Sequence, residues 1–244
     1  RIKDGISQLE GAFSMALLVE DGIIAVRDER GFRPLSLAKL DGAYVVASET
    51  CAFDLIHAEF IRDIEPGEIL FITERGIKSI YISDRKPKSS FCIFEYIYFS
   101  RPDSNIYGNN VHMTRKRQGI ELAKESPAKA DLVIAIPDSG SSAAIGYSEQ
   151  SGIPLDMGMV RNHYIGRTFI QPAQHIRDLS VRVKLNPIKD VVRGKKIVVI
   201  EDSIVRGTTS KARIRTLREA GAKEIHMRVS CPAHISPCYY GIDF

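Results

Sequence analysis

Two adjacent carboxylates, Glu201 and Asp202, follow a short β-branched run at 197–200 and precede a segment rich in glycine and hydroxyl residues. A run of this kind is typical of a parallel strand covered on both faces, and ligands of such sheets bind at the carboxyl ends of strands. Neighbouring carboxylates there suit the hydroxyls of a ribose or a hydrated Mg²⁺. Gly207, Thr208 and Thr209 then open a helical pattern whose free N–H groups suit a monophosphate. The segment therefore predicts a sugar-phosphate site.

The ordinary alternative is an acidic residue that only caps the following helix. A cap needs one side chain, whereas this segment combines two carboxylates, a glycine and consecutive hydroxyl residues at 208–210. The segment does not have the Gly-x-x-x-x-Gly-Lys-Ser/Thr pattern of a P-loop, and the chain contains no Gly-x-Gly-x-x-Gly fingerprint of dinucleotide-binding folds.

Small and hydroxyl-bearing residues also follow the apolar run at 132–136, at Ser139, Gly140, Ser141 and Ser142. Backbone N–H groups at such a strand-to-helix turn can hold an anion. Taken alone, a serine-rich turn is more often a helix cap. Beside the first loop on a neighbouring strand, this turn suits a pyrophosphate.

A long basic segment at 161–172, followed by Arg177, Arg182 and Lys184, lacks a helical or strand period. It fits a lid that closes over an anionic substrate, and a solvated basic loop explains it equally well. The pattern does not support His163 as a catalytic base, and His226 lies in an expected strand.

The helices and strands that must position these loops fall into two regions of the chain. After residue 91, helices are expected at 110–126, 141–150 and 211–220, and buried strands at 132–136, 155–160 and 195–200. This alternation predicts an α/β domain with a parallel, doubly wound sheet. Before residue 81, strands at 12–19, 23–26, 44–48 and 69–72 predict antiparallel sheets, with one helix at 50–56. We place the boundary in the polar stretch 83–90, which gives domains 1–85 and 86–244.

Composition excludes several classes of protein. The 244 residues carry 34 Lys and Arg against 30 Asp and Glu, and the formal net charge of +4 is not gathered in a stripe that would indicate nucleic-acid binding. Apolar runs fall far short of the ~20 residues that span a bilayer, and no secretion signal is present. We expect a cytoplasmic protein without membrane or nucleic-acid partners. Because the chain starts at Arg1 without an initiator Met, we also expect an internal fragment of a longer protein.

Three motifs together resemble the glutamine phosphoribosylpyrophosphate (PRPP) amidotransferases, which end in a type I phosphoribosyltransferase domain. The motifs are Phe-Glu-Tyr-Ile-Tyr-Phe-Ser-Arg-Pro-Asp-Ser at 94–104, Gly-Arg-Thr-Phe-Ile at 166–170, and the loop Glu-Asp-Ser-Ile-Val-Arg-Gly-Thr-Thr-Ser at 201–210. Stretches at 27–35 and 47–50 resemble that family's glutaminase domain, an N-terminal-nucleophile hydrolase. The resemblance covers essentially the whole chain and implies a partial glutaminase domain at 1–85, then a C-terminally truncated phosphoribosyltransferase domain at 86–244.

The resemblance implies a pentosyltransferase that converts PRPP, glutamine and water into 5-phosphoribosylamine, glutamate and pyrophosphate, the first committed step of de novo purine biosynthesis. Ammonia from glutamine would displace pyrophosphate from the sugar. The residues implied to bind PRPP are Glu201, Asp202, Ser203, Arg206, Gly207, Thr208, Thr209, Arg167 and Lys184. Those implied to hold Mg²⁺ are Ser139, Glu201 and Asp202. We also expect a homo-oligomer.

The cysteines bear on both chemistry and cofactors. The family's glutaminase nucleophile is an N-terminal Cys without a counterpart here, so we assign no catalytic residue and expect no glutamine hydrolysis by this chain. Cys51 is internal and has no free α-amine to serve as a base, so we expect it to be structural. Four cysteines without a Cys-x-x-Cys pair favour reduced thiols. Yet some family members bind a [4Fe–4S] cluster, and Cys92 and Cys238 stand where two of its four ligands fall, which implies two more beyond Phe244.

Two other functions stay open at this point. A salvage phosphoribosyltransferase acting on a purine or pyrimidine base shares the loop at 201–210, but its small fold has no place for the β-rich first third. A non-catalytic PRPP-sensing regulator on the same fold usually brings a DNA-binding domain or a basic stripe, and the sequence shows neither.

Overall fold

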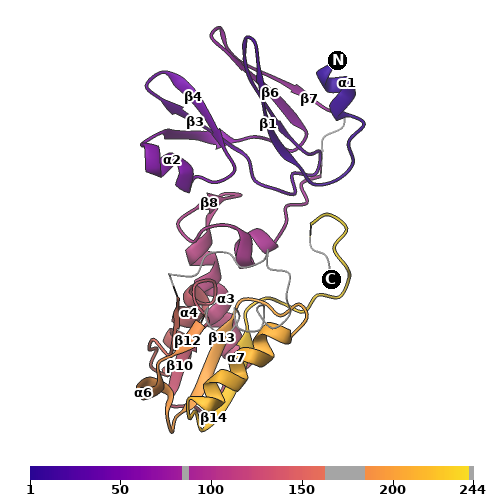
Figure 1. Cartoon of the computed structure of the whole chain (residues 1–244). Coiled ribbons are helices and arrows are strands. Elements are labelled where there is room, and N and C mark those ends of the chain that lie inside the picture. Colours follow the sequence, from indigo (N-terminus) through magenta and orange to yellow (C-terminus); the bar gives the residue numbers. More distant parts are fainter. Residues whose placement is uncertain (84–87, 163–184, 242–244) are drawn as a thin grey trace. The chain divides into compact units, whose positions relative to one another are not determined.

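The computed structural model describes residues 1–83, 88–162 and 185–241. It divides into two compact units (Figure 1). Unit 1 comprises Arg1–Val111 together with the described residues from Pro237 on, and unit 2 comprises His112–Ser236. None of the helices in the described ranges is both long and apolar enough to cross a membrane.

Unit 1 contains two antiparallel sheets. The first has the order β1-β2-β6-β7 and consists of β1 (Ser14–Val19), β2 (Gly22–Arg27), β6 (Glu68–Thr73) and β7 (Gly76–Tyr81). The second has the order β4-β3-β5 and consists of β3 (Ser36–Leu40), β4 (Ala43–Ala47) and β5 (Glu59–Asp63). The remaining elements are α1 (Ile2–Ile6), α2 (Cys51–Ile56), the π-helical turn η1 (Glu95–Phe99), β8 (Asn105–Ile106) and β9 (Asn109–Asn110). The expected antiparallel architecture is confirmed.

The core of unit 1 follows the two-residue alternation of its central strands. Ala25 and Leu70 pack with Leu37 of the second sheet. Their neighbours Ile24 and Ile69 belong to a separate buried cluster that includes Ile6 of α1. Because successive side chains of a strand point to opposite faces, β2 and β6 are covered on both sides. The continuous apolar runs in these two strands reflect that double burial.

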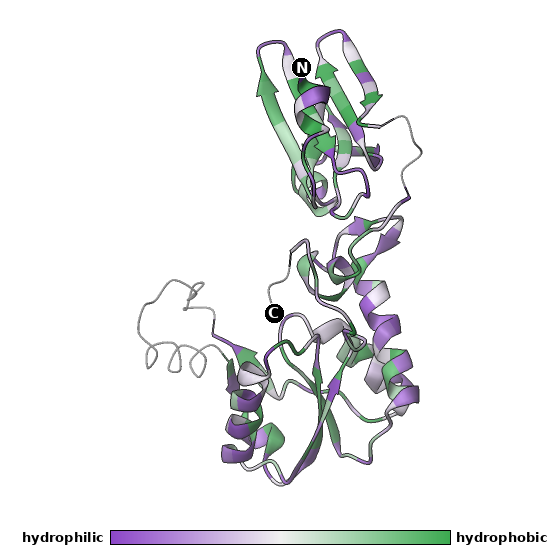
Figure 2. Cartoon of the chain, turned by 90° about the vertical axis from the view of Figure 1, so that its right-hand side faces the viewer, coloured by the Kyte–Doolittle hydropathy of each residue, from purple (hydrophilic) through white to green (hydrophobic). Residues whose placement is uncertain are grey.

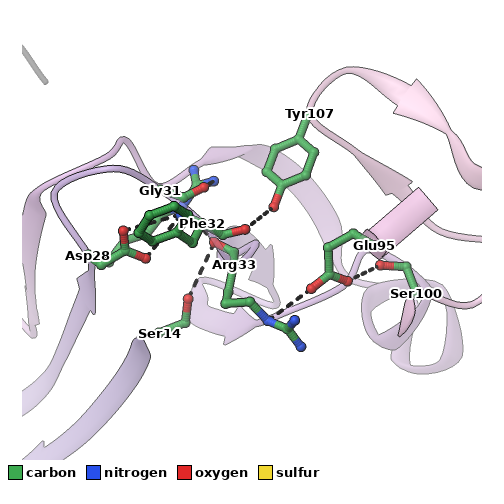
Figure 3. A network of polar contacts seen from close by, with 9 residues as sticks. Ser14, Asp28, Gly31, Phe32, Arg33, Glu95, Ser100 and Tyr107 are labelled. Carbon is green, nitrogen blue, oxygen red and sulfur yellow. Dashed lines mark hydrogen bonds and ion pairs between the residues drawn. The ribbon is translucent and has the colours of Figure 1, made fainter. Parts of the chain in front are cut away.

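Residues 91–107 are tied to unit 1 by buried polar contacts (Figure 3). The Nε of Arg33 lies 3.0 Å from Oε1 of the buried Glu95, whose Oε2 accepts a 2.6 Å hydrogen bond from the Ser100 hydroxyl. The Tyr107 hydroxyl donates to the carbonyl of Phe32 at 2.9 Å. The compact unit therefore extends to Val111, and the expected domain boundary after residue 85 stays a prediction.

Unit 2 is built on a three-stranded parallel sheet. Its order is β10-β13-β14, from β10 (Leu132–Ala135), β13 (Lys196–Glu201) and β14 (Glu224–Val229). The helices are α3 (Val111–Glu125), α4 (Ser141–Ser151), α6 (Lys189–Val192) and α7 (Thr208–Glu219), and β11 (Met159–Arg161) pairs antiparallel with β12 (Leu185–Pro187). The central strands are coloured hydrophobic and the helices carry hydrophilic residues (Figure 2).

Helices cover both faces of this sheet. Ile197 and Val199 of β13 pack with Leu217 of α7, whereas Val198 and Ile200 pack in another cluster with Tyr147 of α4. This two-sided burial explains the unbroken β-branched run in β13. The expected doubly wound sheet is confirmed.

Helices α3 and α4 approach each other at two glycines. A Cβ on Gly119 of α3 would collide with the carbonyl group of Ala143, and a Cβ on Gly146 of α4 would collide with the carbonyl group of Lys116. Only glycine at both positions lets the backbones come this close.

The prediction of a continuous strand at 155–160 is wrong. Leu155 forms a single parallel bridge with Val133, and only Met159–Arg161 forms a strand, which pairs antiparallel with β12. The backbone turns between them, since the N–H of Gly158 donates to the carbonyl of Asp156 at 3.0 Å. An apolar composition alone did not reveal this turn.

A buried carboxylate links three strands of unit 1. Glu68 of β6 is 1 % exposed, and it accepts hydrogen bonds from both terminal nitrogens of Arg62 at 2.8 and 2.7 Å and from the Ser79 hydroxyl at 2.5 Å. Burial by itself raises the pKa of Glu68, but the hydrogen bonds from Arg62, Ser79 and the Glu65 N–H together lower it below the ordinary value.

We expect Glu68→Gln to lower the free energy of unfolding by about 1–3 kcal/mol near neutral pH, because charge-assisted hydrogen bonds are lost. The folded-state pKa is depressed, so the contribution is present above the ordinary pKa of 4.5 and disappears as the pH falls below it. Urea unfolding at about pH 7 and about pH 3 measures the difference. The exposed Glu59→Gln is the control. An equal loss for Glu68→Gln at both pH values contradicts the prediction.

Candidate functional site

The two predicted loops leave the sheet from the same edge. β10 and β13 pair in parallel with Ala135 opposite Ile200, and the N–H of Ile136 donates to the carbonyl of Ile200 at 2.9 Å. The turn that holds Ser139 therefore starts beside the strand end that carries Asp202. The sequence predicted that these two segments meet, and the structure brings them into contact.

Asp202 lies between the two loops. It is 5 % exposed, and its Oδ2 accepts a short hydrogen bond from the hydroxyl of Ser139, which follows the neighbouring strand. The Ser203 hydroxyl donates to Oδ1 at 2.5 Å. Both carboxylate oxygens are therefore oriented by hydroxyl groups, and carboxylate oxygens are ligands that divalent cations prefer.

Glu201 is directed toward α7 and pairs with an arginine that sequence reasoning did not single out. Its Oε2 contacts the Nη1 of Arg213, and Glu201 is only 3 % exposed. Burial raises the pKa of Glu201 to about 7; Arg213 lowers it and the neighbouring Asp202 carboxylate raises it, so burial prevails.

Backbone hydrogen bonds fix the acidic pair from the other side of β13. The N–H of Ser230 donates to the carbonyl of Glu201 at 3.0 Å, and the N–H of Cys231 donates to the carbonyl of Asp202 at 2.9 Å. The pair thus lies at the centre of the sheet edge, with a neighbouring segment on each side. This placement restricts the directions in which the two side chains can move.

The segment after the acidic pair ends in a helix start that is open to solvent. Gly207 has a φ of 73°, a left-handed conformation that glycine adopts without strain, and it is the N-cap of α7. Thr208 and Thr209 in the first turn are exposed, and so is Arg206 before it. The first N–H groups of a helix have no partner within the helix, so a phosphate could accept from them beside the two hydroxyls.

The basic segment expected to form a lid lies largely outside the described residues, which include neither Arg167, Lys184 nor His163. At its near end, Arg161 pairs with Asp138 of the Ser139 turn, with Nη1 and Oδ2 2.6 Å apart and both side chains more than half exposed. Arg167 and Lys184 therefore stay predictions.

The cysteines occupy distinct environments. Cys51 of α2 is 5 % exposed, as expected of a structural residue. The N–H of Cys92 donates to the carbonyl of Phe32, whose ring stacks at 4.7 Å against Tyr240, two residues after Cys238. The segments that carry Cys92 and Cys238 therefore meet at Phe32 within unit 1. The described residues contain no cluster of three or more His, Cys, Asp or Glu side chains that could complete a metal site.

A parallel sheet flanked by helices, with paired carboxylates after one strand and a hydroxyl turn after its neighbour, is the arrangement of a phosphoribosyltransferase. Residues 114–237, about half of the chain, match the family model described as phosphoribosyl transferase domain. The chain belongs to this family.

Among proteins of known function, the chain is similar to amidophosphoribosyltransferases. It is 52% identical over 241 residues to that of Mycobacterium tuberculosis and 51% identical over 243 residues to that of Bacillus subtilis, which covers 99% and 100% of this chain. It spans 45% and 51% of those relatives, about half their length. The expected resemblance to the glutamine PRPP amidotransferases is confirmed.

Solved structures agree with this similarity. The B. subtilis glutamine PRPP amidotransferase in complex with ADP and GMP superposes with a TM-score of 0.91 at 51% identity, over 99% of this chain and 53% of that one. A structure described as the allosteric regulatory enzyme of purine biosynthesis gives a TM-score of 0.90, also at 51% identity, over 99% of this chain and 52% of that one.

Gly140 makes the close approach of the two loops sterically possible. A Cβ at this position would lie 2.5 Å from the carbonyl oxygen of Ile200 and 2.9 Å from that of Ile136. We expect Gly140→Ala to destabilise the protein by about 1–3 kcal/mol, because backbone atoms must shift to make room. Thermal unfolding measures the change.

Gly5→Ala is the control, since a Cβ there meets nothing within 4 Å. We expect this helical substitution to leave stability unchanged or to raise it by about 0.5–1 kcal/mol. If both variants unfold at the same temperature, the loops are not packed as tightly as described.

Proposed function

We propose that this chain is the central part of an amidophosphoribosyltransferase, in which ammonia released from glutamine displaces pyrophosphate from PRPP to give 5-phosphoribosylamine. The observation that carries the proposal is the buried Asp202 carboxylate, which hydroxyl groups of two loops orient at the end of β13. The similarity to amidophosphoribosyltransferases extends over both units. It gives no support to a salvage enzyme or a PRPP-sensing regulator.

Different residues are proposed to bind different groups of PRPP. Glu201 and Asp202 bind the ribose hydroxyls, and the Ser139 turn binds the pyrophosphate group. Thr208 and Thr209 bind the 5-phosphate together with the first N–H groups of α7. Ser203, Arg206 and Gly207 shape the loop between these two ends. Arg167 and Lys184 are proposed to reach the pyrophosphate from the lid.

The donor set also fits Mg²⁺. Glu201, Asp202 and Ser139 supply the hard oxygen ligands that this cation prefers, and a few protein ligands suffice because Mg²⁺ keeps several waters and substrate oxygens. When bound, the cation would neutralise charge on the departing pyrophosphate. The sugar becomes positively charged as its bond to pyrophosphate breaks, so the protein's task is mainly to position the groups and to stabilise charge.

We expect Asp202→Asn to lower the rate of ammonium-dependent pyrophosphate release from PRPP by about 100-fold or more in the full-length protein. The amide keeps the shape of the carboxylate but cannot hold the cation or the ribose hydroxyls in the same way. Release is measured with Mg²⁺ and PRPP, and with ammonium, each nucleobase, or no acceptor.

Asp190→Asn, the same change at an exposed position on α6, is the control and should release pyrophosphate at the normal rate. Release stimulated by a nucleobase instead of ammonium would establish a salvage enzyme. Binding of PRPP without release would favour a regulator.

We also propose that Cys92 and Cys238 ligate a [4Fe–4S] cluster, with the other two thiolates supplied beyond Phe244. In support, the segments that carry the two cysteines converge on Phe32. Four cysteine thiolates are the usual ligand set of such a cluster.

We expect Cys238→Ser to abolish the brown iron–sulfur absorbance of the full-length protein, because serine does not replace a thiolate ligand. The visible spectrum after anaerobic purification is the measurement. Cys231→Ser is the control, since the Cys231 thiol contacts His234 at 3.4 Å and is not assigned to the cluster. An unchanged spectrum in Cys238→Ser would refute the assignment of Cys238 as a cluster ligand.

A further inference from the structure

Arg213 lies on the face of α7 that packs against the sheet. Ser210 and Leu217 are the buried residues of this helix, and Arg213 stands three positions after the first and four before the second. In a helix, residues at these spacings share one face, which is ordinarily an apolar stripe. The Arg213 side chain is only 23 % exposed. A charged residue in this stripe destabilises the fold unless it pairs with an opposite charge.

The partner comes from the strand below the helix. Ile197 and Val199 of β13 pack in the cluster that contains Leu217 of α7. Because side chains alternate along a strand, Glu201 continues the same face and is directed toward α7. The last residue of β13 thus reaches the helix where Arg213 interrupts its apolar stripe, and the two side chains form an ion pair.

The Arg213–Glu201 pair does not have the geometry that would stabilise the fold most. Arg213 contacts Oε2 of Glu201 through Nη1, and its Nε is buried without a hydrogen-bond acceptor among the described residues. A guanidinium binds a carboxylate best through two parallel hydrogen bonds. Well-packed apolar residues often stabilise a core as well as a buried ion pair does. The pair therefore suggests a role in the site.

We infer that Arg213 is a positioning residue that holds the Glu201 carboxylate in place to bind the ribose hydroxyls of PRPP. This inference rests on the function proposed above. Arg213 restrains Glu201 from the helix side, while Ser139 and Ser203 restrain Asp202 from the loop side. Arg213 also reduces the negative charge of the acidic pair, which limits repulsion between the site and the phosphates of PRPP.

The test is the substitution Arg213→Met in the full-length protein. Methionine fills similar space without a charge, so Glu201 loses its partner and its orientation. We expect the dissociation constant of PRPP with Mg²⁺, measured by calorimetry, to rise about tenfold or more. The KM for PRPP should rise in parallel while kcat changes much less, because the affected contact is made before and during the reaction alike.

Two variants separate positioning from packing. Arg213→Lys keeps the positive charge, and we expect it to restore most of the affinity. Arg215→Met is the same substitution on the exposed side of α7, where Arg215 pairs with Glu219. It should bind PRPP normally. Failure of Lys to restore binding in a folded protein would overturn the inference.

The double variant Arg213→Met/Glu201→Gln completes a cycle. If Arg213 acts through Glu201, the double variant binds PRPP as weakly as Glu201→Gln alone, whereas fully additive losses overturn the inference. This comparison also decides the matter if Arg213→Met alone does not fold, because the double variant leaves no unpaired buried charge.

The unmodified full-length protein distinguishes a failure of the Arg213 inference from a failure of the proposed function. If it binds PRPP and Arg213→Met binds equally well, only the role of Arg213 is refuted. If the unmodified protein itself neither binds PRPP nor releases pyrophosphate, the proposed function fails and the role of Arg213 fails with it.

Discussion

The parallel pairing of β10 with β13 is the constraint on which the site depends. It sets Ala135 beside Ile200, so that the chain emerges from both strands at the same level of the sheet. A hydroxyl turn from one strand can then contact a carboxylate from the other, although 62 residues separate Ser139 from Asp202 in sequence. The absence of a side chain at Gly140 lets the two backbones come close enough.

Both faces of β13 are apolar along the strand and end in a carboxylate. Ile197, Val198, Val199 and Ile200 are all almost completely buried, alternately under α7 and under α4. The next two residues, Glu201 and Asp202, continue this alternation, and each carboxylate contacts a polar partner on its own side of the sheet. The burial that stabilises the strand therefore also brings two negative charges together. A bound cation or sugar hydroxyls would reduce the repulsion between these charges.

Much of this arrangement follows from local sequence signals. The runs in β2, β6, β10 and β13 are apolar on both faces, so their strands were predictable, and the small and hydroxyl residues after β10 and β13 identified the loops. β3, β5 and β7 were missed because short or largely solvent-exposed strands carry mixed composition. Arg213 was missed because it stands among the basic residues of α7, and only its spacing from Ser210 and Leu217 distinguishes it.

The glycine contacts between α3 and α4 have a consequence for tracing distant relatives. Loop residues that bind ligands change when a protein acquires a new substrate, whereas a helix crossing without Cβ atoms admits no substitution unless the helices separate. Gly119 and Gly146 lie on the two helices that meet at this crossing, and α4 begins directly after the Ser139 turn. A glycine pair at this spacing should therefore persist in sequences whose loop motifs have diverged, and it offers a marker for aligning them.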